Sequence, residues 1–283
     1  MSAAPKPAPH DFGPNPFLSK RTLVIPHGGG DGLFPENTLL AFERTMALGA
    51  DVVDVDLRKS ADGVPMAIHD GAVKRTTGAD GQVATMTAAE LGKLDAGWAF
   101  KIGNDFPFRA KGVRVPTLEA ILKRFPNALL SLDLKDESFA MVKPVCDLLR
   151  RYNRRVDVFV GSNSDDQIFR FRADCPDVRT SATLADVYAA RDARNSNDGA
   201  FKPAASVDQP PYRINGRTLV DTDSLAWDHS HNIAILTWVV NDPKDMQHLV
   251  EIGVDGIYTS YPDRLLKVIE KIHGKKRVVQ PVR

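Results

Sequence analysis

The stretch Val24–Asp70 decides both the fold and the chemistry of this chain, and it reads VIPHGGGDGLFPENTLLAFERTMALGADVVDVDLRKSADGVPMAIHD. A short apolar run leads into a glycine-rich turn that begins at His27. A second apolar run carries Asp54 and Asp56 two residues apart, the spacing of one face of a strand. His69 comes at the end. Two imidazoles beside carboxylates that can hold a hard cation are suited to attack on a phosphate ester.

Beyond this stretch, short β-rich runs alternate with helical patterns almost to the end of the chain. Eight such alternations predict an α/β fold, a (β/α)8 TIM-type barrel with a small insertion after the second strand. An open doubly wound sheet is the alternative, although HGGGDG lacks the GxGxxG spacing of a dinucleotide turn. The expected strands are Thr22–Ile25, Val52–Leu57, Ala128–Leu134, Val156–Gly161, Val178–Ser181, Ala204–Val207, Ile233–Val240 and Gly256–Thr259. The expected helices are Thr38–Leu48, Leu118–Phe125, Ser138–Tyr152, Asp165–Ala173, Ala182–Arg191, Thr222–His229, Pro243–Ile252 and Pro262–His273.

The same patterns divide the chain into one domain with two terminal segments. We expect a flexible, proline-rich segment over residues 1–20, a single barrel domain over 21–273 and a basic tail over 274–283. Residues 71–112 break the alternation with turn residues, and we interpret them as an insertion that folds over the mouth of the barrel. A second irregular stretch, Asn195–Arg217, predicts another loop at the mouth.

Composition limits the classes of function. The chain has 283 residues with a net charge of +1, which gives no reason to expect nucleic acid as a partner. No apolar run is long enough for a transmembrane segment, and no signal peptide is visible, so we expect a cytoplasmic location. The two cysteines, Cys146 and Cys175, have no metal-binding spacing and form no evident framework, so they do not require an oxidising compartment.

Three aspartates are the candidate metal ligands. Asp54 and Asp56 are expected to point into the barrel near its carboxyl-terminal mouth, where such barrels hold their active sites. Asp133 ends another apolar strand, LLSLDL, and could complete an all-oxygen site for Mg²⁺, Ca²⁺ or Mn²⁺. The alternative is that the aspartates only form ion pairs, Asp54 and Asp56 with Arg58 and Asp133 with Lys135.

His27 and His69 are the candidate catalytic pair. The Asp62-Gly63 turn folds the chain back after the second strand, which could return His69 to the mouth near Asp54 and Asp56. One imidazole could then deprotonate the nucleophile while the other protonates the leaving alcohol. The backbone N–H groups of the turn that begins at Gly28 could approach phosphate oxygens, although an ordinary loop turn by itself explains the glycines better.

Other side chains are placed to help. Lys135 could bind a phosphate oxygen, and Trp238 could form a wall of the substrate pocket or be a buried core residue. Glu36 and Asn37 precede a helix whose cap is Asn37 or Thr38, and either could contact the metal shell or orient His27.

The ordered segments HGGGDGLFPENTLLAF, DVDLRKSADGVPMAIHD, LDLK, TWVVND and GVDGIYTSYPD resemble the glycerophosphodiester phosphodiesterase family from about Leu23 to Leu266. The resemblance implies a TIM-type barrel with a divalent cation on Asp54, Asp56 and Asp133, an acid–base pair of His27 and His69, and Lys135 on the phosphate. It implies hydrolysis of a glycerophosphodiester to glycerol phosphate and an alcohol, with attack by the substrate's own glycerol hydroxyl as one route.

The chain departs from the pattern of this family at its phosphate clamp. The family usually has an arginine after the first histidine, where this chain has Gly28, and Arg58 is a candidate substitute. Asp54 and Asp133 stand where the family usually has glutamate, and Ser260 where it usually has aspartate. Two alternatives to the phosphodiesterase therefore stay open: lysophospholipase D action on lysophospholipids, with the Asn195–Arg217 loop and Trp238 lining an apolar entry, and a phosphodiester-binding barrel without catalysis.

Overall fold

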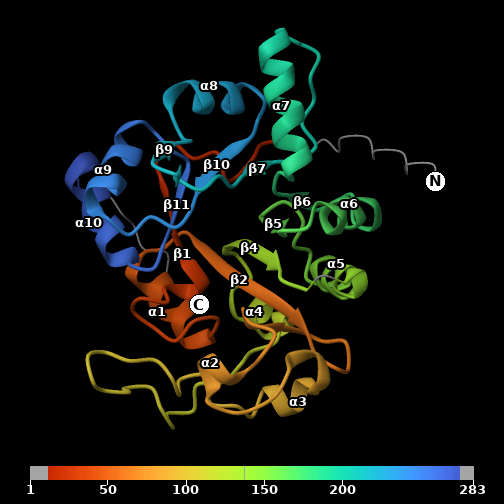
Figure 1. The fold of residues 1–283 in the computed structure, drawn as a ribbon, viewed down its shortest axis with the longest axis vertical. Helices are drawn as coiled ribbons and strands as arrows, with labels where there is room; N and C mark the ends of the chain where they lie inside the picture. The colour runs from red at the N-terminus through yellow and green to blue at the C-terminus, as the bar shows by residue number, and fades with distance from the viewer. Residues whose placement is uncertain (1–11, 137, 275–283) are drawn as a thin grey trace.

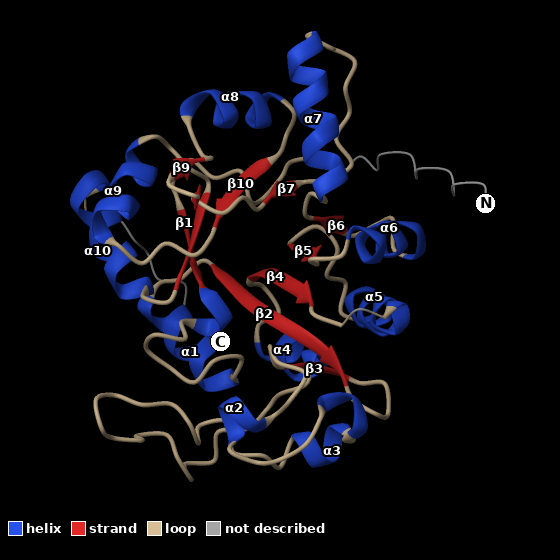
Figure 2. Ribbon diagram, viewed as in Figure 1, coloured by secondary structure: helices blue, strands red, loops and turns tan. Residues whose placement is uncertain are grey.

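The structure is a computed structural model that describes residues 12–136 and 138–274, and it is a (β/α)8 TIM-type barrel (Figures 1 and 2). The barrel strands are β1 (Leu23–Pro26), β2 (Val52–Lys59), β4 (Leu129–Leu134), β5 (Val158–Gly161), β6 (Arg179–Thr180), β7 (Val207–Asp208), β10 (Ala234–Thr237) and β11 (Gly256–Thr259). The helices around them are α1 (Leu39–Leu48), α4 (Leu118–Arg124), α5 (Val142–Arg151), α6 (Asp165–Asp174), α7 (Leu184–Ser196), α8 (Thr222–Ser230), α9 (Pro243–Glu251) and α10 (Pro262–His273).

The strands form a parallel ring. Strands β2, β4, β5 and β6 pair in that order, and β7, β10, β11 and β1 pair in that order. A parallel bridge between Ser181 and Val207 joins β6 to β7, and the backbone N–H of Asp51 donates to the carbonyl of Val24 to join β2 to β1. Because all eight strands run in one direction, their carboxyl ends meet at one mouth.

Local chemistry explains where the helices begin. Thr38 accepts the backbone N–H of Ala41 and caps α1, and Thr117 caps α4 in the same way. α7 runs five residues beyond the predicted end and stops at Asn197, which adopts the left-handed conformation of a helix end. The seventh predicted strand, by contrast, is too long. The observed strand, β10, ends at Thr237, because Trp238 and Val239 leave the barrel wall and are exposed at the mouth.

The predicted hairpin after β2 is present. β3 (Pro65–Ala67) pairs antiparallel with β2, and Gly63 in the turn has φ of +84°. The insertion that follows contains two short helices, α2 (Lys74–Thr77) and α3 (Ala88–Leu91), which lie together beside the barrel in Figure 1. Apolar side chains of the insertion, of β3 and of the residues that flank them form a separate small core: Met66, Ile68, Val73, Val83, Leu91, Ala96, Val113 and Val115.

The expectation of a flexible segment over residues 1–20 does not hold from residue 12 onward. Phe17 is fully buried and packs edge-on against Phe159 of β5, with ring centroids 4.9 Å apart. Asn15 donates to the carbonyls of Ser206 and Asn232. The proline-rich pattern gave no indication that this segment packs against the barrel. One buried aromatic side chain is enough to anchor the segment to the barrel interior. Residues 1–11, and the basic tail from residue 275, lie outside the described residues.

The two cysteines correct another expectation. Cys146 of α5 and Cys175, just after α6, form a disulfide with their Cα atoms 5.9 Å apart. The sequence gives no sign of this pairing, because the cysteines are 29 residues apart and become neighbours only when α5 and α6 pack side by side. They therefore form a one-bridge framework.

Among the helices of the described residues, none combines the length and the apolarity needed to cross a bilayer.

Candidate active site

The register of β2 against β4 brings the predicted carboxylates together. Asp54 lies beside Ser131, and Asp56 lies beside Asp133. Asp54 and Asp56 are buried in the barrel, and Asp133 is partly buried. The two-residue spacing therefore gives the side-chain direction correctly, and the parallel pairing supplies the neighbour.

These carboxylates open into a cavity of about 420 Å³ at the mouth of the barrel. The cavity is lined by His27, Asp54, Asp56, His69, Ser131, Asp133, Lys135, Ser162, Asn163, Ser181, Ala182, Gln209, Trp238, Val239 and Tyr258. Seven of the predicted site residues thus share one chamber: both histidines, the three aspartates, Lys135 and Trp238.

Asp54 is held by two donors. Its carboxylate accepts the backbone N–H of Gly28 at 2.9 Å and the hydroxyl of Ser131 at 2.7 Å. Burial and the neighbouring charge of Asp56 nevertheless raise the pKa of Asp54 to about 6. This carboxylate therefore lies in a place where negative charge is incompletely compensated.

Lys135 provides part of the missing positive charge. Its ammonium lies 2.6 Å from Asp133 Oδ2 and 3.1 Å from Asp56 Oδ1. Burial opposes the charged form of Lys135, but the charges of Asp133 and Asp56 outweigh it and raise the pKa of Lys135. The ion pair considered as the alternative for Asp133 is thus present.

The fit of these residues to a divalent cation rests on their chemistry. Within the described ranges, no group of three or more histidine, cysteine, aspartate or glutamate side chains has the arrangement of a metal site. Asp133 Oδ1, however, is buried with no hydrogen-bond partner among the described residues, and Asp133 lies beside Asp56 in the β2–β4 register. Carboxylate oxygens are the ligands that Mg²⁺, Ca²⁺ and Mn²⁺ prefer, so the donor set suits such an ion.

His27 is arranged to carry a proton. Its Nδ1 lies 3.3 Å from a carboxylate oxygen of Asp31. Burial lowers the pKa of His27, but the hydrogen bond to Asp31 and the charges of Asp54, Asp31 and Asp56 together raise it to about 9. The surrounding carboxylates therefore favour the protonated imidazole, the form that can serve as an acid.

His69 is positioned by a chain of ion pairs. Its Nδ1 lies 2.8 Å from Asp70, and Asp70 in turn binds Arg75 of α2. Arg75 also forms two hydrogen bonds with Glu36, at 2.6 and 2.7 Å. The hydrogen bond from Arg75 lowers the pKa of Asp70 to about 2, so Asp70 keeps its charge beside His69. Glu36 thus acts on the insertion and on His69 rather than on His27.

Asn37 and Gly28 hold two carboxylates of the site in place. Asn37 donates to Asp56 at 2.8 Å and accepts the backbone N–H of Asp56 at 2.9 Å, which fixes this carboxylate. Gly28 has φ of +52°, and its N–H is already bound to Asp54. This N–H therefore binds a carboxylate of the site, whereas the sequence had suggested that it could bind a phosphate oxygen.

Arg58 and Trp238 differ in their relation to the cavity. Arg58 donates to the carbonyl of His69 and to Asp136, so it ties β2 to the loop after His69 and does not line the cavity. Its predicted pairing with Asp54 and Asp56 is absent from the described contacts. Trp238 is 45% exposed at the mouth, and its Nε1 donates to the carbonyl of Gln209.

A row of hydrogen-bonded polar side chains crosses the barrel, and the sequence analysis did not predict it. Ser131 contacts the hydroxyl of Tyr258 at 3.0 Å, and Gln209 donates to the same hydroxyl at 2.6 Å. Ser131 shares a strand face with Asp133, so the two-residue spacing could have found it. Tyr258 lies on β11 and Gln209 directly follows β7, and only the closed ring brings them near Ser131.

Comparisons with known proteins identify the family of this chain. The model of the glycerophosphoryl diester phosphodiesterase family matches residues 27–264. The protein YhdW of Bacillus subtilis (strain 168) is 32% identical, over 86% of this chain and 96% of its own length. The crystal structure of a glycerophosphodiester phosphodiesterase from Agrobacterium tumefaciens is 28% identical and superposes with a TM-score of 0.70, covering 87% of this chain and 99% of that one.

A human lysophospholipase D, GDPD1, is 25% identical over 88% of this chain and 85% of its own length. The family model spans both histidines, the three aspartates, Lys135 and Trp238. The chain belongs to the glycerophosphoryl diester phosphodiesterase family and is, as a member of it, a phosphoric diester hydrolase.

Proposed function

We propose that this protein hydrolyses glycerophosphodiesters to glycerol 3-phosphate and an alcohol, with His27 and His69 as the acid–base pair. One observation carries the proposal: two imidazoles, each anchored at Nδ1 by an aspartate, line the same cavity as three carboxylates and a lysine. A phosphodiester needs one group that takes a proton from the nucleophile and another that gives one to the leaving oxygen.

The two histidines divide these roles by their surroundings. The Nδ1 of His27 faces Asp31, which favours the protonated imidazole, so His27 donates a proton to the leaving alcohol. His69 has Nδ1 turned to Asp70, which leaves Nε2 to accept a proton from the nucleophile. Water serves as the nucleophile, or the substrate's own glycerol hydroxyl attacks first and expels the alcohol, after which water opens the resulting cyclic phosphate to glycerol 3-phosphate.

Asp54, Asp56 and Asp133 would hold a divalent cation, Mg²⁺, Ca²⁺ or Mn²⁺. The ion would supply Lewis-acid stabilisation of the phosphate charge and a lower pKa for a coordinated hydroxyl. Lys135 would then be released from its carboxylate partners to meet a phosphate oxygen. Trp238 forms a wall for the alcohol, and Arg58 supports the phosphate side indirectly through the His69 loop.

Lysophospholipase D action is the second candidate, and the surface of the mouth favours it. Trp238 and Val239 are 45% and 37% exposed beside the cavity, where they could contact an acyl chain. The human relative named as a lysophospholipase D supports the same activity class.

The test is a substrate panel after chelator treatment. Glycerophosphocholine, glycerophosphoethanolamine and lysophosphatidylcholine are assayed with Mg²⁺, Ca²⁺ or Mn²⁺ added back. We expect turnover of the first two that depends on the added ion. A preference for the lysophospholipid would instead support the second candidate, and binding without turnover would support a barrel that only binds phosphodiesters.

The cytoplasmic location expected from the sequence stays a prediction, and the Cys146–Cys175 disulfide weighs against it. Disulfides persist mainly in oxidising compartments. Fractionation of the source cells, with thiol labelling of the purified protein, distinguishes the two locations.

A further inference from the structure

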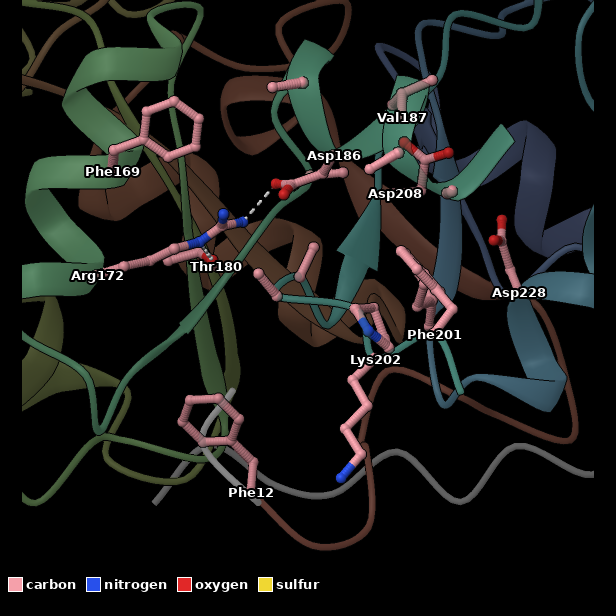
Figure 3. Close-up of a pocket in the computed structure, with 18 of the residues that line it drawn as sticks. Phe12, Phe169, Arg172, Thr180, Asp186, Val187, Phe201, Lys202, Asp208 and Asp228 are labelled. Carbon is pink, nitrogen blue, oxygen red and sulfur yellow. Dashed lines mark hydrogen bonds and ion pairs between the residues drawn. The ribbon is translucent and has the colours of Figure 1, made fainter. Parts of the chain in front are cut away.

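A second cavity, of about 310 Å³, lies on the outside of the barrel wall between α6, α7 and α8 (Figure 3). Most of the side chains around it are apolar. They include Phe169 of α6, Val187 of α7 and Phe201 from the loop after α7. This volume falls in the range of small-molecule sites in proteins.

This outer cavity is separated from the active-site cavity by a single layer of backbone. Thr180 of β6 and Asp208 of β7 face the outer cavity, while the next residues along the chain, Ser181 and Gln209, line the active site. This is the alternation of a strand, whose successive side chains point to opposite faces. The outer cavity is thus a distinct chamber that the hydrolysis proposed above does not use.

Two carboxyl groups face this chamber with little compensation. Asp228 of α8 is 9% exposed, and no described residue donates a hydrogen bond to its carboxylate. Asp208 of β7 has the backbone N–H of Gln209 beside it and otherwise faces the cavity. Figure 3 shows both carboxylates on the same side of the chamber. Burial raises the pKa of Asp208 to about 6, and burial together with the charge of Asp208 raises the pKa of Asp228 to about 7.

The other charged groups nearby leave this pair without a close cation. Arg172 is occupied, because its guanidinium donates to Asp186, to Thr180 and to the carbonyl of Ser181. Lys202 extends to the opposite end of the chamber in Figure 3. Arg194 of α7 is exposed and acts on Asp228 only through its charge, and Asp186 and Asp255 add further negative charge near Asp208 and Asp228 respectively.

We propose that the outer cavity binds a small organic ammonium ion with an apolar body, and that Asp208 and Asp228 are its counter-ions. The two carboxylates would pair with the ammonium hydrogens, and the aromatic and aliphatic wall would cover the hydrocarbon part. A metal ion is disfavoured, because it needs more oxygen ligands than the two carboxylates and finds mostly apolar side chains around it. An anion is also disfavoured, because the negative charges of Asp208 and Asp228 would repel it.

The probes are hexylammonium and 1-hexanol, which have nearly the same shape and differ in charge. Their binding to the full chain is measured by isothermal titration calorimetry at pH 8 and at pH 5. At pH 8 both carboxyl groups are mostly ionised, and at pH 5 they are mostly protonated. We expect hexylammonium to bind roughly tenfold or more tightly at pH 8 than at pH 5, whereas hexanol binding stays nearly constant.

Variants locate the site. Asp208→Asn and Asp228→Asn each should weaken hexylammonium roughly tenfold at pH 8 and leave hexanol unchanged. Ala190→Phe should fill the chamber and abolish binding of both probes, because Ala190 lines it. Asp223→Asn, an exposed change on the same helix α8, is the matched control and should have no effect. Equal binding of the two probes, insensitivity to both Asn variants, or no binding of either probe would overturn the proposal.

Discussion

The two cavities on either side of the β6–β7 wall differ in how many donors hold their buried carboxylates. At the mouth, Asp54 and Asp56 are held by named donors, namely Gly28, Ser131, Asn37 and Lys135. In the outer cavity, Asp228 has no described hydrogen-bond donor. A buried carboxylate that accepts hydrogen bonds from several donors keeps its geometry, which catalysis needs. A buried carboxylate without a donor is destabilised in its charged form, and binding a cation or a proton relieves that cost.

The largest expected effect lies at the mouth. His27→Ala and His69→Ala each should lower kcat by roughly 10²–10⁴-fold, because each removes a group that transfers a proton in the transition state. Steady-state hydrolysis of glycerophosphocholine measures the loss. His248→Ala, an exposed histidine on α9, is the control and should keep full activity. Turnover near that of the unmodified protein in either variant would remove that histidine from the mechanism.

The next effect concerns the side of the barrel that holds the outer cavity. Cys146→Ala combined with Cys175→Ala should lower the free energy of unfolding by ~3.5 kcal/mol, the chain-entropy value for a loop of this length. Because α6 lines the outer cavity and not the mouth, kcat should change little. Urea unfolding with and without a reductant measures the difference. A reductant that shifts the double variant as strongly as the unmodified protein would show that the bridge is not the cause.

A smaller effect, of opposite sign, is expected at Asp228. Its pKa is about 7 in the folded protein against an ordinary value of 3.8, so folding favours the protonated carboxyl. The stability that this group contributes is present below pH 4 and is lost as the pH rises through 7. Asp228→Asn should therefore stabilise the protein by about 1–3 kcal/mol at pH 8 and change little at pH 4.

Thermal unfolding of the Asp228→Asn variant at the two pH values measures this effect, with the exposed Asp223→Asn as its control. A gain that is equal at pH 4 and pH 8 would contradict the inferred pKa. If the outer carboxylate were already paired like those at the mouth, the variant would be less stable at pH 8 instead.

The same contrast explains what could be predicted from the sequence. The mouth is built from short-range patterns: the two-residue spacing in DVDL and LDL, the turn at Gly63 and the cap at Thr38. These patterns place side chains before any tertiary contact is known. The placement of seven predicted site residues around one cavity follows from them and from the parallel register.

The rest depends on contacts between distant segments. Cys146 and Cys175 meet only because α5 packs beside α6, and Phe17 is buried only because the barrel has an interior to receive it. Asp208 and Asp228 come from a strand and a helix separated by a segment that contains a short antiparallel pair, β8 (Arg213–Ile214) and β9 (Arg217–Thr218). Local spacing carries no signal for such pairs, so the disulfide, the anchored segment and the outer cavity were not foreseen.

The smallest expected effect concerns Gly28, which stands where the family usually has an arginine that binds the phosphate. Gly28→Arg places a side chain where φ is +52°, which costs roughly 1–2 kcal/mol of stability for a residue with a Cβ. The space allows it, because a Cβ at position 28 would be no closer than 3.5 Å to its nearest neighbour, the side chain of Asn37. The added guanidinium can pair with a phosphate, so KM for glycerophosphocholine should fall roughly two- to tenfold. Gly28→Ala carries the same backbone strain without the charge, and an equal KM in the two variants would show that the arginine does not bind phosphate here.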